Sequence, residues 1–207
     1  NSSNNDNNVP YVAWNWKANT TPSKTYVVTV VSDSGNKYRF DGFGTSAVTL
    51  DLQEGGTYKF DQSHSSNSGH PFRFGTSANG SDYTTGVTTS GTPGNSGAYT
   101  QITVAAGAAT LYYACSAHSG MGGQANTNST SGSSNFSGSI QSNLSANVDA
   151  GFSIVKWVGN QNSAQTIGHG LGVVPEMMIV KNTSRVKVWA VYHKDIGNEY
   201  ALDLSAT

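Results

Sequence analysis

Cysteine is nearly absent from this sequence, because the 207 residues contain only one, Cys115. A single thiol cannot form a disulfide within the chain, so this residue is either a small core side chain or a metal ligand. Charge is also scarce, since only 11% of the residues are charged and the net charge is −1. Nucleic-acid binding needs clustered lysine and arginine. The composition therefore predicts no nucleic-acid partner.

Long hydrophobic runs are missing as well. No stretch reaches the about 20 apolar residues that a membrane-spanning helix needs, so we predict no membrane insertion. Residues 1–8 are Asn, Ser and Asp, which is not a signal peptide. Because no initiator methionine is present, we expect a processed chain or a piece of a longer protein. No Ser/His/Asp set or pair of carboxylates stands out, and the sequence predicts no enzyme.

What the sequence does contain is a series of short segments rich in β-branched and aromatic residues, separated by turn signals. The predicted strands are residues 26–31, 37–40, 48–52, 57–61, 71–74, 98–104 and 110–115. Between two of them, residues 75–97 form a Gly/Ser/Thr-rich loop. About seven short strands with turns between them are typical of a β-sandwich. The predicted fold class is all-β, with a second, smaller β-rich unit after the sandwich.

The composition divides the chain into four parts. Residues 1–23 are predicted to be an N-terminal arm with a first strand, and residues 24–126 the sandwich. Residues 127–148 are rich in Ser, Asn and Gly and predict a linker. Residues 149–207 predict a β-rich domain, which we expect to be incomplete because the sequence stops soon after a strand.

Four residues have the side chains of one kind of metal site. Cys115, His118 and Met121 follow one another at intervals of three, and His70 stands at the start of a predicted strand. One thiolate, two imidazoles and a thioether are the ligand set of a blue-copper site. The alternative is a buried free cysteine with two surface histidines. His64, in the loop before His70, is expected to be a solvated loop residue, and the less favoured alternative is that it replaces one of the ligands.

Residues 113–122, with the order Tyr-Ala-Cys-Ser-Ala-His-Ser-Gly-Met-Gly, resemble the C-terminal ligand loop of the cupredoxin family. The resemblance covers roughly residues 24–126. It implies a cupredoxin-like Greek-key β-sandwich with copper as its cofactor. By that resemblance the equatorial ligands are His70, Cys115 and His118, and the axial ligand is Met121.

A second resemblance lies outside the sandwich. Residues 14–19, 147–160, 167–182 and 189–193 are together similar to a β-rich domain in large virion proteins of marine tailed phages, usually described as tail-fibre or appendage proteins. In that family the first of these segments leads through a short linker to the second. About a hundred cupredoxin-like residues separate them here, which implies a domain inserted at an exposed polar loop.

These resemblances lead to a functional prediction with two alternatives. The prediction is a structural virion protein, as a phage fibre, appendage or capsid decoration, that displays the cupredoxin-like module for adhesion to a host surface. Its partners would be other virion proteins, copies of itself in a homo-oligomer, and a host receptor or glycan. Its location would be the virion, outside the cell. The first alternative is a copper-binding redox or electron-transfer protein, and the second is a subunit of an extracellular filament.

Overall fold

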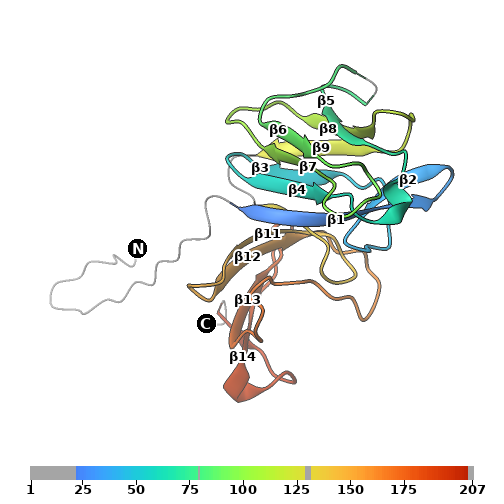
Figure 1. Ribbon diagram of the computed structural model, residues 1–207. Helices are drawn as coiled ribbons and strands as arrows, with labels where there is room; N and C mark the ends of the chain where they lie inside the picture. The colour runs from blue at the N-terminus through green and yellow to red at the C-terminus, as the bar shows by residue number, and fades with distance from the viewer. Residues whose placement is uncertain (1–21, 79, 129–131, 205–207) are drawn as a thin grey trace. The chain divides into compact units, whose positions relative to one another are not determined.

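The computed structural model describes residues 22–78, 80–128 and 132–204, and it confirms an all-β chain (Figure 1). The predicted N-terminal arm, residues 1–23, lies outside the described residues except for its last two. No helix among the residues described is long and apolar enough to cross a membrane. The chain forms two compact units, residues 1–170 and 171–207, which are considered separately below.

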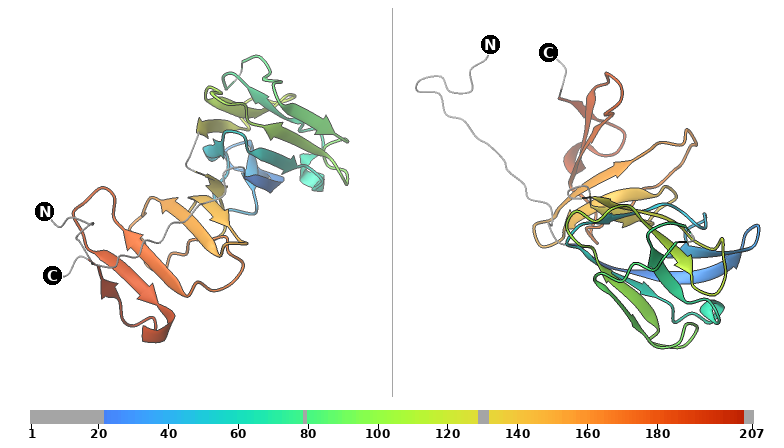
Figure 2. Two further views of the ribbon diagram at one scale, coloured as in Figure 1. Left: turned by 90° about the vertical axis from the view of Figure 1, so that its left-hand side faces the viewer. Right: turned by 90° about the horizontal axis from the view of Figure 1, so that it is seen from above.

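The first unit contains a β-sandwich whose two sheets lie face to face (Figure 2). One sheet has the order β2-β1-β4-β7-β6 and contains β1 (Ser23–Ser32), β2 (Asn36–Phe40), β4 (Thr57–Asp61), β6 (Val87–Ser90) and β7 (Tyr99–Thr103). The other has the order β3-β9-β8-β5 and contains β3 (Leu50–Gln53), β5 (Phe72–Gly75), β8 (Leu111–Cys115) and β9 (Gly123–Asn128). The pairs β1–β4 and β3–β9 are parallel, and the other pairs are antiparallel. The cupredoxin-like Greek-key topology stays a prediction.

The core between the sheets is unusually aromatic. Alternation along each strand sends every second side chain inward, so Tyr26 and Val28 are buried while Val27 between them is 49% exposed. The rings of Phe60 and Phe72, one from each sheet, stack with their centroids 4.7 Å apart. The fully buried aromatic residues around them are Tyr26, Tyr38, Phe40, Tyr58, Phe74 and Tyr113. Stacked and edge-on ring pairs of this kind stabilise a core beyond their buried area.

Strand β9 lies in the middle of the second sheet, between β3 and β8. The predicted sandwich ended at residue 126, inside this strand, because its polar sequence gives little sign of burial. In the structure Ala125 is fully buried and lies in register with both Leu50 and Leu111. A small side chain suffices there, since the neighbouring leucines fill the space. Strand β6 similarly occupies part of the predicted loop 75–97.

Residues 127–148, predicted as a linker, instead contribute to a three-stranded sheet. This sheet has the order β10-β11-β12 and contains β10 (Ser133–Asn135), β11 (Ser142–Asn147) and β12 (Phe152–Trp157). Strand β10 is hydrogen-bonded to the sandwich, because the Tyr26 hydroxyl donates to the Ser134 carbonyl over 2.8 Å. Phe136, directly after β10, is only 5% exposed and belongs to the sandwich core. The first compact unit ends at residue 170.

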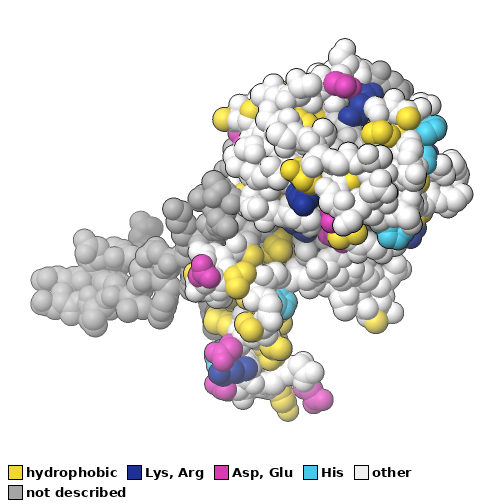
Figure 3. Space-filling model, viewed as in Figure 1, with side chains coloured by type: hydrophobic (Ala, Val, Ile, Leu, Met, Phe, Trp, Pro, Cys, Tyr) yellow, Lys and Arg dark blue, Asp and Glu magenta, His cyan; other side chains and the backbone are white. Residues whose placement is uncertain are grey.

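The second unit, residues 171–207, is a small sheet with little interior. Its order is β13-β14-β15, and it contains β13 (Met177–Lys181), β14 (Trp189–His193), the 3-10 turn η2 (Lys194–Ile196) and β15 (Leu202–Asp203). Among its described residues, Val191 is the only buried hydrophobic side chain. Hydrophobic side chains gather on the surface over these strands (Figure 3).

Candidate metal centre

Strand pairing brings the first two predicted ligands together. Strands β5 and β8 are antiparallel neighbours, and Phe72 lies opposite Cys115 in their register. The ladder continues one step further, because the Ser116 amide donates to the Pro71 carbonyl over 3.0 Å. His70 therefore lies beside the end of β8, although 45 residues separate it from Cys115 in the sequence.

The loop that carries His70 is held by buried amide side chains. It follows the 3-10 turn η1 (Ser65–Asn67), and the His70 amide donates to the Asn67 carbonyl over 2.8 Å. Asn67 is fully buried, and its side-chain amide donates to the Val28 carbonyl in β1. The Gln62 side chain binds the backbone at His70 and at Phe72. Its Nε2 donates to the His70 carbonyl over 2.9 Å, and its Oε1 accepts from the Phe72 amide over 3.1 Å. These bonds fix the backbone on both sides of the histidine.

His118 lies in the loop that joins β8 to β9. The turn is tight because Gly120 adopts a φ of +72°, a conformation that side chains disfavour. Lys37 Nζ donates to the Gly120 carbonyl over 2.6 Å and closes the loop against the end of β2. At Gly122 the backbone runs so close to β8 that an added Cβ would lie 1.7 Å from the Tyr113 carbonyl oxygen. Glycine is therefore required where this loop returns to the sheet.

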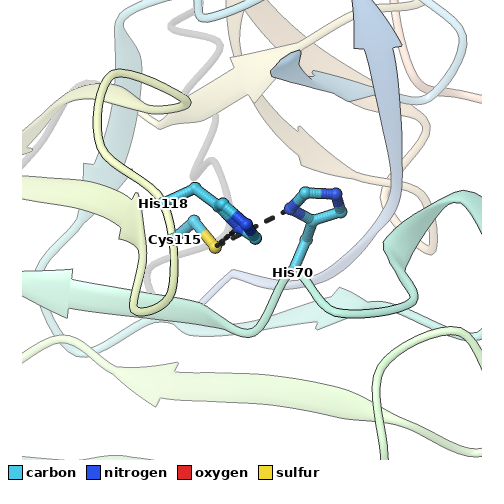
Figure 4. Close-up of side chains that lie close together, drawn as sticks. All are labelled: His70, Cys115 and His118. Atoms are coloured by element: carbon cyan, nitrogen blue, oxygen red, sulfur yellow. Dashed lines mark hydrogen bonds between the residues drawn. The ribbon is translucent and has the colours of Figure 1, made fainter.

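The three donor atoms lie at the spacing of a coordination sphere (Figure 4). Cys115 Sγ is 3.9 Å from His70 Nδ1 and 3.7 Å from His118 Nδ1. With a metal–nitrogen distance of about 2.0 Å and a metal–sulfur distance of about 2.3 Å, a trigonal arrangement places sulfur about 3.7 Å from each nitrogen. The two observed sulfur–nitrogen distances, 3.7 and 3.9 Å, lie close to this value. This His-Cys-His cluster could hold a metal ion.

The surroundings of Cys115 and His70 differ in their contacts. The Ala117 amide donates to Cys115 Sγ over 3.4 Å. Desolvation lowers the pKa of His70, and the neighbouring His118 lowers it further. A metal binds neutral imidazole, so a lower pKa keeps His70 ready to coordinate at neutral pH. Cys115 is buried, whereas His118 is exposed, so the site opens to solvent on the His118 side.

The predicted axial ligand occupies a different environment. Met121 is 1% exposed and packs in the sandwich core, where its carbonyl accepts from the Tyr38 amide over 2.9 Å. Its role as a ligand stays a prediction. The alternative ligand His64 is not part of the cluster. Its ring instead accepts a hydrogen bond from the Ser66 amide and caps η1.

Sequence reasoning missed the residues that hold the ligands. Gln62, Asn67 and Tyr38 are buried polar or aromatic residues in contact with the His70 loop, and none was predicted to belong to the site. The only signal for Gln62 and Asn67 is an amide side chain close to a candidate ligand in the sequence. Their partners are backbone groups, which become visible only when the strand pairing is known.

Comparison with known proteins gives one partial match. Residues 124–207 are similar to a domain of unknown function, DUF7483. The matched stretch begins within β9, so it includes the end of the sandwich, the sheet β10-β11-β12 and the second unit. No curated protein and no solved structure matches the chain significantly.

Proposed function

We propose that the β-sandwich binds one copper ion through His70, Cys115 and His118, with Met121 as a weak axial ligand. The observation that supports this best is the spacing of the donor atoms, because the two sulfur–nitrogen distances of 3.7 and 3.9 Å are close to those of a trigonal metal site. A thiolate and two imidazoles with a distant thioether favour copper over the oxygen-preferring cations. Zinc would take a strong fourth ligand, which this cluster does not offer among the described residues.

A copper ion bound there would supply one-electron redox chemistry. The strand ladder and the Gln62 side chain would hold His70 and Cys115 in place around it. The exposed imidazole of His118 is the part of the site that an electron donor or acceptor can approach. The proposed activity is therefore copper binding with one-electron redox chemistry.

The test is a titration of the purified chain with Cu(II). One equivalent should produce an intense visible band from charge transfer between the Cys115 thiolate and copper. The band should disappear in Cys115→Ser, while His64→Ala, which removes a nearby histidine outside the cluster, should keep it. A colourless protein with no stoichiometric copper by elemental analysis would rule the proposal out.

A second candidate function is a structural role in a virion, as a fibre, appendage or capsid decoration that displays the sandwich for adhesion. The specific observation in its favour is the second unit. Its exposed large hydrophobic residues are Val173, Val174, Met177, Met178, Ile179, Val180, Val186, Val188, Trp189, Tyr200, Leu202 and Leu204. A unit of this size rarely folds alone without a disulfide, a metal or oligomerisation.

The exposed apolar area is sufficient for self-association. If each of these side chains presents on the order of 150 Å² when fully exposed, and about half of that here, the unit offers on the order of 900 Å². A stable protein interface needs about 800 Å² from each partner. Copies of this chain, or other virion proteins, are therefore the proposed partners, and the proposed location is the virion, outside the cell. Both functions are compatible, because a displayed module can hold a metal.

Sedimentation of the full chain tests this second candidate. We expect a homo-oligomer at micromolar concentration that Ile179→Lys, in β13, dissociates. Val158→Lys serves as the control, because Val158 is 81% exposed and lies in the first unit. A closed oligomer would favour a virion component, whereas open-ended assemblies would favour an extracellular filament. A stable monomer at all concentrations would contradict both.

A further inference from the structure

Strand β13 lies at the edge of the sheet in the second unit, and no described residue pairs with its outer side. The strand has five residues, as many as the central strand β14, whereas β15 at the opposite edge has only two. Edge strands usually carry charged residues that discourage further pairing, as β2 does with Lys37 and Arg39. The only charged residue of β13 is its last, Lys181. The strand therefore has an edge that is open to pairing with another strand.

The pairing of β13 with β14 determines which backbone groups face this open edge. Glu176, one residue before β13, lies opposite Lys194 in the register of the two strands, and its carbonyl accepts from the Lys194 amide over 2.8 Å. Hydrogen-bonded and non-hydrogen-bonded pairs alternate along an antiparallel ladder, so every second residue after Glu176 also bonds to β14. The residues between them direct their backbone groups to the open edge, and these are Met177, Ile179 and Lys181.

Two antiparallel copies of β13 fit one another best in a single register. With Ile179 opposite Ile179 of a second copy, Met177 lies opposite Lys181, and every residue of each strand is paired. A shift of the centre to the preceding residue would place Lys181 opposite Pro175, which has no amide proton to donate. A shift to the following residue would place Met177 opposite Thr183, which lies beyond the strand. The open edge of β13 is therefore complementary to its own copy.

The side chains of β13 also suit this register. Ile179 would meet its own copy on one face of the sheet, and Met178 would lie opposite Val180 on the other. These three side chains are 46%, 43% and 43% exposed in the single chain, so the pairing would cover apolar surface. Lys181 would lie opposite Met177, where its apolar stem can pack on the thioether and its charge meets no like charge.

We infer that β13 pairs with β13 of a second copy of this chain, antiparallel and with Ile179 at the two-fold axis. The two three-stranded sheets then form one continuous sheet. This inference rests on the self-association proposed above, and it names the strand, the register and the symmetry of the contact. Because each copy contributes the same surface, the contact closes at a dimer.

Disulfide formation between copies tests the register. In a chain that also carries Cys115→Ser, Ile179→Cys places the only thiol opposite its own copy, with Cα atoms about 5.5 Å apart, which a disulfide can span. Met177→Cys is the matched control, because Met177 lies on the same face and is 52% exposed. Its two copies would lie about 14 Å apart along the strands, since four residues at about 3.4 Å each separate them. Under mild oxidation, Ile179→Cys should form a linked dimer at least about tenfold faster than Met177→Cys.

The outcomes separate this inference from the proposal on which it rests. An unmodified chain that sediments as a monomer would overturn self-association and the β13 contact together. An oligomer in which Met177→Cys links as fast as Ile179→Cys would overturn the β13 contact and leave self-association standing. If Ile179→Cys does not link, a mixture of Met178→Cys and Val180→Cys chains decides, because the Cα atoms of a non-hydrogen-bonded pair lie only about 4.5 Å apart. The mixture should link faster than either chain alone, and equal rates would overturn the inference.

Discussion

Replacement of Phe136 by alanine should destabilise the sandwich, although this residue lies in the segment that the sequence predicted to be a linker. The ring is 5% exposed. Its centroid lies 5.3 Å from that of Phe43, 5.8 Å from that of Tyr26 and 5.9 Å from that of Phe40. Truncation of a buried phenylalanine to alanine costs about 3–5 kcal/mol. That is a large share of the about 5–15 kcal/mol by which a domain is stable.

Urea unfolding measures the effect. Residues 22–128 contain no tryptophan, so the near-ultraviolet circular dichroism of the buried tyrosines reports on the sandwich. Tryptophan fluorescence reports on the four tryptophans outside this range, Trp14, Trp16, Trp157 and Trp189. With a slope of about 2 kcal/mol per molar urea, Phe136→Ala should lower the tyrosine midpoint by about 1.5–2.5 M. Val148→Ala should change the free energy of unfolding, measured with the same tyrosine signal, by at most about 0.5 kcal/mol, because Val148 is 60% exposed. Equal midpoints for Phe136→Ala and Val148→Ala would refute the claim that this segment is part of the core.

Two further predictions concern the ligand loop and the first sheet. Gly122→Ala should destabilise the chain by more than about 3 kcal/mol, since its Cβ would meet a backbone oxygen. Gly120→Ala should cost only the about 1–2 kcal/mol of a left-handed backbone, because its Cβ would meet only the Lys37 Nζ atom, at 4.0 Å. Urea midpoints of the two variants compare them, and equal losses would contradict the close approach. Hydrogen bonds from the Ser63 side chain and then its amide lower the pKa of Asp61. Asp61 therefore contributes stability that is present above its unfolded pKa of about 3.9 and is lost as the pH falls through the lower folded value. The difference in midpoint between the chain and Asp61→Asn should shrink in that acidic window, and a constant difference down to pH 2 would refute the assignment.

The sequence was sufficient to predict those strands and ligands that a local pattern of side chains determines. Strand β4 was predicted with its observed bounds, because Tyr58 and Phe60 alternate with polar residues and can only face one core. Cys115 and His118 could be paired from their spacing, since both lie in a single short segment. His70 could be added because it directly precedes a strand. The structure brings these three residues together in a cluster that could hold a metal, and their role as equatorial ligands stays a prediction.

The sequence was not sufficient to predict those strands whose burial depends on pairing with distant segments of the backbone. Strands β9 and β10 are polar, and their burial depends on neighbours from distant parts of the chain. Ala125 is buried between Leu50 and Leu111, and the Ser134 carbonyl accepts from the Tyr26 hydroxyl. No local pattern encodes such contacts, so the predicted linker and domain boundaries differ from the observed ones.

The two parallel strand pairs of the sandwich have a consequence for how such a module can be shared between proteins. The first strand begins with Ser23 opposite Thr57, and the last ends with Asn128 opposite Gln53. Both ends of the sandwich therefore lie beside one short turn, residues 54–56. A segment that enters and leaves at one place can be placed within a host chain, or removed from it, without separating the host's own strands. The two ends of residues 23–128 thus lie side by side, as the ends of an inserted domain do, while Phe136 adds to the core from the segment that follows.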